Sequence, residues 1–282
     1  ALQGVRQADV KLGEYVAVIG LGLVGLITVE LLKANGCTVI GLDISNDHFD
    51  LARTLGCDAC ILSDLDSLKK VESITQGYGT DAVIITAATN SNKPLEQALH
   101  FARRKSKVVI VGAVGLTIPR SPFYEKELDL CISCSYGPGR YDPQYEEKGI
   151  DYPIGYVRWT ERRNMGAVLK LLAEKKLDLR RLITHRFSIA NATQAYDLIT
   201  GKGTEKYLGI LIEYPGHDLS TEHVNSTDEL SRTLRPSLGK QELSVGFIGA
   251  GNFAQSSLLP HLRKQPIRLK GVATSRPVSA KS

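Results

Sequence analysis

Short continuous apolar runs alternate along most of the chain with longer stretches in which apolar residues recur at helical spacing. Continuous apolar runs are typical of strands in a parallel sheet that helices cover on both faces. The alternation therefore predicts an α/β fold with a doubly wound parallel (Rossmann) sheet. We expect its strands at residues 16–19, 37–43, 59–62, 81–88, 107–113 and 128–136, and an opening helix over residues 1–8.

The first predicted strand runs into a glycine-rich turn. Gly20, Gly22 and Gly25 are spaced i, i+2 and i+5, and a helix-length segment follows them. In this pattern the first glycine permits a tight turn, the second lets the backbone approach a pyrophosphate, and the third lets the helix lie close to the strand. The N–H groups at the start of that helix, around Leu23 and Val24, would face the phosphates. The spacing predicts a dinucleotide site.

The second predicted strand ends on an acid, Asp43, which lies 18 residues past Gly25. A carboxylate there can accept both hydroxyls of an adenosine ribose and would repel a 2′-phosphate, which favours NAD over NADP. We place the neighbouring Ile44 and His48 in the same site, although a solvated surface histidine is an equal interpretation of His48. Two alternatives to the dinucleotide site are a tight turn without a ligand and a methyltransferase that binds an adenosine on a similar fold.

Two later strands also end in residues suited to a ligand, since ligands of such sheets bind at the carboxyl ends of strands. Thr86, Ala87 and Thr89 close the fourth strand. The residues that close the fifth strand are placed to present backbone groups to a nicotinamide carboxamide, with plain sheet core and turn as their alternative. These residues are Val111, Gly112 and Ala113.

Composition and charge narrow the class of protein. The 282 residues are 43% hydrophobic and 23% charged, and the basic residues behind the net charge of +5 are scattered, so we expect no nucleic-acid partner. No apolar run reaches the 18 or more residues of a membrane helix, and no signal-peptide pattern opens the chain. We therefore expect no membrane partner and a cytoplasmic location. The first residue is Ala1, and we expect a fragment cut at both ends.

Five cysteines at uneven spacing argue against a disulfide framework. Two pairs have the C-x-x-C spacing of zinc ligands, Cys57 with Cys60 and Cys131 with Cys134. The second pair lies in a predicted strand, in which residues three apart point to opposite faces, and the first pair flanks the entry to a buried strand. We therefore expect small buried side chains here and no metal.

Several of these motifs together resemble the cofactor domain of the medium-chain dehydrogenase/reductase family, which includes the zinc alcohol, sorbitol and threonine dehydrogenases. The motifs are the run from Gly13 to Gly25, Gly-Leu-Asp43, Ala-Arg-Thr-Leu-Gly-Cys-Asp58 and Val-Val-Ile-Val-Gly112. The resemblance covers residues 1–214 and implies NAD as cofactor, a small-molecule substrate and a homo-oligomer. It also implies a β-barrel domain before Ala1, which would carry the catalytic groups and zinc ligands and to which strands at 182–188 and 207–214 return. We therefore name no catalytic residue and expect this chain alone to be inactive.

Residues 136–165 depart from that family's pattern. They hold aromatic residues among arginines, and we expect Pro138, Pro143 and Pro153 to forbid a regular element. Tyrosines stacked on a sugar ring and a contact between domains or subunits explain the aromatic residues equally well. The aromatic residues are Tyr136, Tyr141, Tyr145, Tyr152, Tyr156 and Trp159.

The opening pattern returns near the end of the chain, after a polar stretch at 215–241 that we interpret as a linker. Residues 242–282 predict the beginning of a second Rossmann unit and resemble the start of the glucose-fructose oxidoreductase/inositol dehydrogenase family. Thr-Ser-Arg at 274–276 stands where an acid is expected, which suggests NADP in this unit. The second glycine turn and its helix start consist of Gly249, Gly251, Asn252, Phe253 and Ala254.

These patterns predict a nicotinamide-dependent oxidoreductase that interconverts an alcohol and a ketone. The pairing of the two modules resembles enzymes of surface-polysaccharide and sugar metabolism, which implies a sugar derivative as the substrate class. The alternative is a non-catalytic NAD-binding module with a role in sensing or assembly, because no proton-transfer constellation stands out. His185 and Lys206 are polar candidates, and a structural or solvated role fits each of them better.

Overall fold

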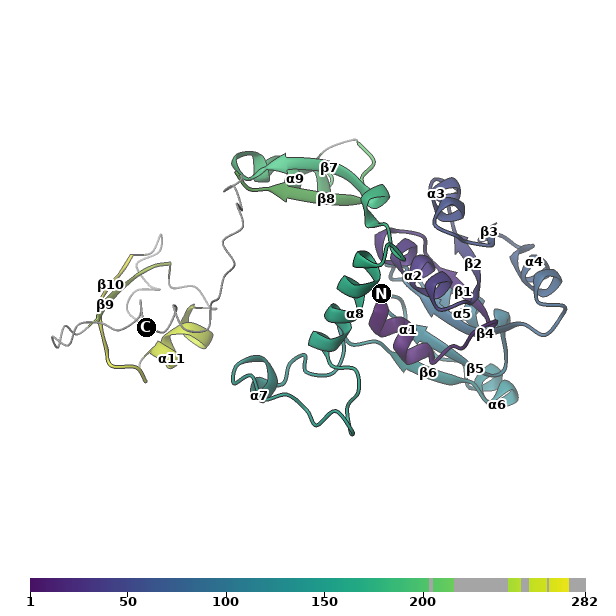
Figure 1. The fold of residues 1–282 in the computed structure, drawn as a ribbon, viewed down its shortest axis with the longest axis horizontal. Helices are drawn as coiled ribbons and strands as arrows, with labels where there is room; N and C mark the ends of the chain where they lie inside the picture. Colours follow the sequence, from purple (N-terminus) through teal and green to yellow (C-terminus); the bar gives the residue numbers. More distant parts are fainter. Residues whose placement is uncertain (203–204, 216–242, 250–253, 263, 274–282) are drawn as a thin grey trace. The chain divides into compact units, whose positions relative to one another are not determined.

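The computed structural model describes residues 1–202, 205–215, 243–249, 254–262 and 264–273 (Figure 1). Its contacts divide the chain into two units, Ala1–Pro215 and Gly216–Ser282, which we describe separately. Nearly all of the linker predicted at 215–241 lies outside the described residues, as do Gly251, Asn252, Phe253 and residues 274–276.

The first unit is built on a six-stranded parallel sheet in the order β3-β2-β1-β4-β5-β6, which confirms the predicted doubly wound fold. Ile19 at the end of β1 lies opposite Leu42 of β2 on one side and Ile85 of β4 on the other. The carboxyl ends of the three central strands are therefore level. The strands are β1 (Tyr15–Ile19), β2 (Thr38–Asp43), β3 (Ala59–Leu62), β4 (Thr80–Ile85), β5 (Ala102–Ile110) and β6 (Asp129–Ile132).

Helices cover both faces of this sheet. On one face Val16 and Val18 of β1 pack with residues of α1, α2 and α3, such as Leu26. On the other face Ala17 and Ile19 pack with residues of α4 and α5. Successive residues of β1 thus bury opposite faces, which explains the continuous apolar run. The helices are α1 (Leu2–Ala8), α2 (Leu23–Ala34), α3 (Phe49–Thr54), α4 (Ser67–Ile74), α5 (Lys93–Phe101) and α6 (Arg120–Lys126).

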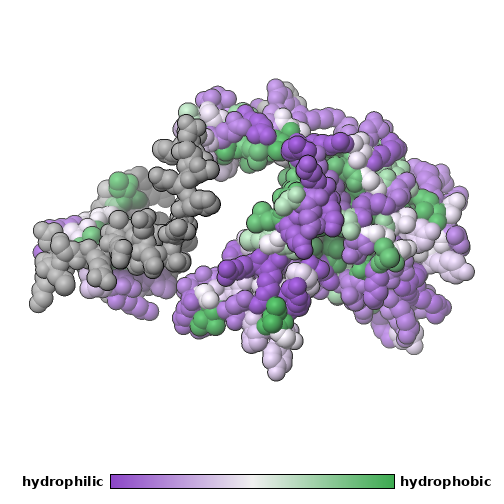
Figure 2. Space-filling view, in the orientation of Figure 1, coloured by the Kyte–Doolittle hydropathy of each residue, from purple (hydrophilic) through white to green (hydrophobic). Residues whose placement is uncertain are grey.

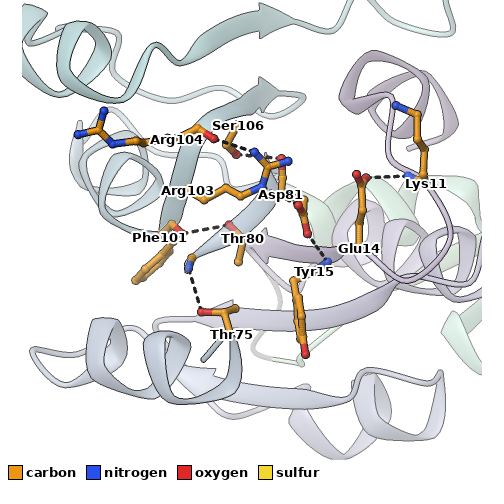
Figure 3. A network of polar contacts seen from close by, with 11 residues as sticks. Lys11, Glu14, Tyr15, Thr75, Thr80, Asp81, Phe101, Arg103, Arg104 and Ser106 are labelled. Carbon is orange, nitrogen blue, oxygen red and sulfur yellow. Dashed lines mark hydrogen bonds and ion pairs between the residues drawn. The ribbon is translucent and has the colours of Figure 1, made fainter. Parts of the chain in front are cut away.

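A carboxylate ties together the amino ends of three strands (Figure 3). The Asp81 side chain at the start of β4 accepts from the backbone N–H of Tyr15 at 2.8 Å and from Nε of Arg103 at 2.6 Å. The Asp81 carbonyl accepts from the hydroxyl of Ser106 at 2.9 Å. These bonds join β1, β4 and β5 at one edge, which helps to hold their opposite, carboxyl ends in register.

Residues 133–160, which we call the tyrosine segment, follow β6 and lead into α8 (Glu161–Ala173). β6 ends at Ile132, four residues before the predicted end, so Cys134 lies outside the strand. The expectation that the prolines forbid a regular element is wrong, because Pro143 begins the short helix α7 (Pro143–Glu146). Proline suits a first helical position, where its missing N–H would have no partner in the helix, and the Asp142 side chain caps this helix by accepting from Gln144 N.

The tyrosines of this segment fall into two groups. Tyr145 and Tyr152 stack on each other with ring centroids 5.5 Å apart, and Tyr145 Oη donates to Thr160 at 3.0 Å. Tyr141 and Tyr156 are 68% and 91% exposed. Figure 2 shows hydrophobic patches over α8 and beside α7 in the same part of the first unit. One pair of tyrosines therefore builds the segment, and the others remain at the surface.

The rest of the first unit contains a separate two-stranded parallel sheet, β7 (Ile183–Ser188) with β8 (Gly209–Glu213). Between the strands lie η2 (Ile189–Asn191) and α9 (Ala192–Ile199), and η1 (Leu179–Leu182) precedes β7. No helix among the described residues combines the length and the apolar character that crossing a bilayer requires.

In the second unit β9 (Leu243–Ile248) pairs in parallel with β10 (Ile267–Ala273), as their sequence predicts. The sequence predicts one helix from Phe253 to about Gln265 between these strands, and the described part of the connection is less regular. It holds one π-helical turn, η3 (Ala254–Leu258), and the short α11 (Leu259–Leu262).

Candidate functional site

The glycine turn after β1 is packed tightly at two of its three glycines. Gly20 has φ +100°, and a Cβ there would lie 2.7 Å from the backbone N of Ala87 at the end of β4. A Cβ on Gly25 would lie 1.9 Å from the carbonyl oxygen of Gly20. Contacts within the protein therefore explain both glycines, because a side chain at either position would push α2 or β4 away from β1.

Gly22 is different, because no protein contact explains it. A Cβ on Gly22 would meet no described atom within 4 Å, and its φ of −72° suits any residue. The first N–H groups of any α-helix have no intrahelical partner, and Gly22, the N-cap of α2, has no side chain that could accept from them. Open space above a bare backbone at a helix start is the arrangement that binds a phosphate.

Asp43, the last residue of β2, holds this turn in place. Its Oδ2 accepts from the backbone N–H of Leu21, between the first two glycines, at 2.6 Å. Its Oδ1 accepts from Ser45 N at 3.2 Å. A carboxylate has lone pairs for about four hydrogen bonds, so two bonds leave Asp43 able to accept from ligand hydroxyls.

One cavity of about 620 Å³ joins the turn to the acid. It brings together seven predicted residues, namely Gly20, Gly22, Asp43, Ile44, Thr86, Ala87 and Thr89. Ile44 is 88% exposed, which leaves an apolar surface at the rim beside the carboxylate. The cavity also includes polar residues that the sequence did not indicate. The unpredicted polar residues are Ser63, Ser91, Lys93 and Gln97.

Thr86, just past β4, connects the strand to the turn. Its hydroxyl contacts the carbonyl oxygens of Gly20, at 2.5 Å, and Ile19, at 3.2 Å. The Gly20 carbonyl is thus held between the Thr86 hydroxyl and the backbone of Gly25. A polar residue at the end of an otherwise apolar strand is the signal in the sequence for this contact.

The other predicted residues of the first unit lie outside the cavity lining. The N–H groups of Val111 and Gly112 both donate to the Ile85 carbonyl, and the Ala113 carbonyl accepts from Thr89 N. Those three groups are engaged in joining β5 to β4, which leaves the carbonyls of Val111 and Gly112 and the N–H of Ala113 for a ligand. His48 precedes α3, Leu23 and Val24 are exposed in the first turn of α2, and Gly249 belongs to the second unit.

No group of three or more His, Cys, Asp or Glu side chains among the described residues is arranged to hold a metal. The thiol of Cys57 is buried, and its hydrogen bond with Cys60, followed by burial, raises its pKa. His185 contacts Thr184 at 2.8 Å and Glu205 at 3.2 Å. Lys206 is paired with Asp47 at 2.8 Å, so both polar candidates already have partners on the surface.

Comparison with known proteins finds similarity to dehydrogenases. Residues 24–148 match the family model described as zinc-binding dehydrogenase. A 200-residue stretch is 29% identical to D-guloside 3-dehydrogenase of Escherichia coli K12, covering 70% of this chain and 53% of that protein.

Two solved structures share the fold. The alcohol dehydrogenase TADH from Thermus sp. ATN1 superposes with a TM-score of 0.61 at 23% identity, over 76% of this chain and 55% of that one. A Sinorhizobium meliloti 1021 protein bound to NADP superposes with a TM-score of 0.56 at 24% identity, over 75% and 55%. The chain spans about half the length of these proteins. The first unit therefore contains a domain similar to zinc-type dehydrogenases.

Proposed function

We propose that this chain provides the cofactor-binding part of a nicotinamide-dependent oxidoreductase that transfers hydride between the cofactor and an alcohol or ketone. The observation that carries the proposal is the bare backbone at Gly22, where no described protein atom accounts for a glycine. A diphosphate accounts for it, because it needs close approach to the backbone at a helix start. The same cavity contains the acid that a ribose needs.

The residues of the cavity fit the successive parts of a dinucleotide, from the pyrophosphate to the adenine. The pyrophosphate lies against Gly20, Gly22 and the first turn of α2, and Asp43 accepts from the adenosine ribose hydroxyls. Ile44 packs against the adenine. We propose NAD rather than NADP in this unit, since the Asp43 carboxylate would repel a 2′-phosphate. The bound nicotinamide supplies the hydride acceptor or donor, and the protein binds and orients it.

A sugar derivative is the substrate class that we propose. The support is the similarity to a protein named D-guloside 3-dehydrogenase, together with the exposed tyrosines of the tyrosine segment. We assign no catalytic residue within this chain. A homo-oligomer and a cytoplasmic location are part of the same proposal.

We also propose that the second unit begins another dinucleotide-binding module, of the glucose-fructose oxidoreductase/inositol dehydrogenase type, which accepts NADP. Its described part supports this through the parallel pair β9–β10 and through Gly249, which follows β9 with φ +90°. The chain then divides into a Rossmann domain at 1–214, a linker at 215–241 and the second unit at 242–282.

The test of the first site is a calorimetric titration of this chain with NADH and with NADPH, using wild type and Asp43→Asn. Asparagine keeps an acceptor for the Leu21 N–H, so the turn is retained while the charge is removed. We expect wild type to prefer NADH and the variant to lose at least about tenfold of that preference, which is 1.4 kcal/mol. Asp66→Asn, an exposed acid at the start of α4, is the control that should keep the preference. Equal affinity of wild type for both cofactors would contradict the role of Asp43, and failure to bind either would contradict the proposed function.

A further inference from the structure

Buried side-chain atoms that lack a hydrogen-bond partner are concentrated in one neighbourhood of the first unit. Within the described part of the chain there are six such atoms, and only Glu30 Oε2 lies elsewhere. Buried polar atoms are normally paired, so a group of unpaired ones requires an explanation. The five atoms are Arg6 Nε on α1, Ser133 Oγ and Arg140 Nε in the tyrosine segment, and Glu161 Oε2 and Asn164 Oδ1 on α8.

Arg6 and Asn164 lie where α1 meets the tyrosine segment and α8. Asn164 is 3% exposed, and its Nδ2 donates to Gln3 Oε1 at 3.2 Å and to the Tyr136 carbonyl at 2.9 Å. The guanidinium carbons of Arg6 and Arg158 lie 3.5 Å and 3.9 Å from the ring centroid of Trp159. Two guanidinium groups this close to one centroid have no room on the same face, so the indole is held between them. Burial, and then the charge of Arg158, lower the pKa of Arg6.

The backbone of the tyrosine segment is also strained. Ser135 and Tyr141 have φ of +43° and +65°, which side chains rarely adopt. Gly137 has φ +109°, and a Cβ there would lie 2.6 Å from Gln3 Oε1. Strained residues beside unpaired polar atoms are found in switch regions, among other functional sites.

Helix α1 links this neighbourhood to the edge at which we place the nicotinamide. Its C-cap, Asp9, lies beside the middle of β5, because it pairs with Lys107 at 3.6 Å. Its first turn lies at the carboxyl end of β5, because a Cβ on Gly4 would be 2.4 Å from Cγ2 of Val111. No free space separates Gly4 from Val111, so a shift of the Val111–Ala113 edge has to move the first turn of α1, and Gln3 with it.

We propose that the tyrosine segment is a strap with two arrangements, and that a nicotinamide bound at the Val111–Ala113 edge shifts it, through α1, from the arrangement described here to the other. This inference rests on the proposed function. In the second arrangement the five buried atoms gain partners, which supplies the difference in free energy that a ligand needs in order to shift a population.

The experiment uses Trp159, the single tryptophan of the chain, as a reporter. Its emission is recorded on excitation at about 295 nm while NAD⁺ or ADP-ribose is added, and calorimetry measures binding of each ligand in parallel. ADP-ribose contains the diphosphate and both riboses and lacks the nicotinamide. We expect both ligands to bind, but only NAD⁺ to change the Trp159 emission and to change backbone hydrogen exchange across residues 133–160 by at least about twofold.

Two matched variants test the route through α1. Arg6→Ala removes the guanidinium that α1 contributes to Trp159, and Arg158→Ala removes the one that the segment contributes. We expect Arg6→Ala to bind NAD⁺ and lose most of the NAD⁺-dependent change in hydrogen exchange, whereas Arg158→Ala keeps it. Hydrogen exchange is the readout because each variant also alters the emission directly.

The outcomes separate the two proposals. If neither ligand binds, the proposed function fails. If both bind and NAD⁺ changes neither emission nor exchange, the strap is wrong, and the unpaired atoms hold only water. Equal changes in emission and exchange with ADP-ribose and NAD⁺ would also overturn the strap, because the shift would then not come from the nicotinamide. An equal NAD⁺-dependent change in hydrogen exchange in Arg6→Ala and Arg158→Ala would overturn the route through α1.

Discussion

The chain contains the same turn twice, and the two copies have different surroundings. Each begins with a short strand and a glycine of positive φ, Gly20 at +100° and Gly249 at +90°. Ile19, before the first glycine, is 3% exposed, and Ile248, before the second, is 96% exposed. A Cβ on Gly20 would lie 2.7 Å from Ala87 N, whereas one on Gly249 would meet no described atom within 4 Å.

The difference comes from the neighbouring strands. β1 lies inside a six-stranded sheet, and the end of β4 provides Ala87 against Gly20 and Thr86 against its carbonyl. β9 has one described partner, β10. The glycine motif therefore sets the local backbone in both places, but a binding cavity requires the next strand of the sheet.

The largest expected effect is at the third glycine position, where the two turns differ in residue. Gly25→Ala places a Cβ 1.9 Å from the Gly20 carbonyl oxygen, and neither backbone can move without breaking the contact with Thr86. The second turn already has alanine there, Ala254. We expect Gly25→Ala to lower the free energy of unfolding by about 3 kcal/mol or more, measured by urea denaturation. Gly166→Ala in α8, with no described atom within 4 Å of the added Cβ, is the control and should be neutral or slightly stabilising.

The next effect compares the first glycines directly. Gly20→Ala adds a contact with Ala87 to the strain of a positive φ, whereas Gly249→Ala adds only the strain, about 1–2 kcal/mol. Hydrogen exchange by mass spectrometry, read separately over β1 and β9, measures each unit by itself. We expect Gly20→Ala to increase the rate of hydrogen exchange in β1 by a larger factor than Gly249→Ala increases it in β9. Similar changes in both would show that the neighbouring strand contributes nothing.

The same contrast explains which features the sequence predicts. β3 has the predicted bounds, because a short apolar run bounded by turn residues is a local signal. The glycines and Asp43 were found because their spacing along the chain is fixed by one strand-turn-helix-strand unit. The start of α7 at Pro143 also has a local signal, because an aspartate before a proline is typical of a helix start. The prolines alone predict the absence of a regular element there, which is wrong.

Features that depend on strand order could not be predicted in this way. Lys93 and Gln97 reach the cavity because α5 begins beside β4, and the sequence alone does not show that β4 pairs with β1. Backbone groups of Val111, Gly112 and Ala113 are predicted to face a nicotinamide, but the sequence does not show which of them are free. Pairing of β5 with β4 directs the N–H groups of Val111 and Gly112 to the Ile85 carbonyl. Residues distant in sequence become neighbours only once the sheet is assembled.

A smaller effect, on binding rather than folding, is expected at the glycine that the protein itself does not require. Gly22→Ala meets no described atom and keeps an ordinary φ, so it should lower the free energy of unfolding by no more than about 1 kcal/mol. The added methyl group points into the space proposed for the diphosphate. We expect the Kd for NADH to rise by about tenfold, measured by calorimetry beside a thermal-unfolding scan. Unchanged affinity would show that no diphosphate lies against the first turn.

The smallest effect concerns the helix that follows the first turn. Glu30 on α2 is 8% exposed, and its Oε1 accepts from Asp178 N at 3.2 Å, which ties α2 to the segment before β7. Burial raises the pKa of Glu30. The folded state therefore holds this proton more tightly than the unfolded state does, so the contribution of Glu30 to stability falls as pH rises through the raised pKa.

Glu30→Gln keeps an acceptor for Asp178 N without the charge, and we expect it to be more stable than wild type at pH 7 by at most about 1 kcal/mol. The advantage should vanish near pH 4, where the carboxyl is protonated in both states. Urea denaturation at both pH values measures it, and an equal difference at the two would mean that the charge of Glu30 has no part in fixing α2.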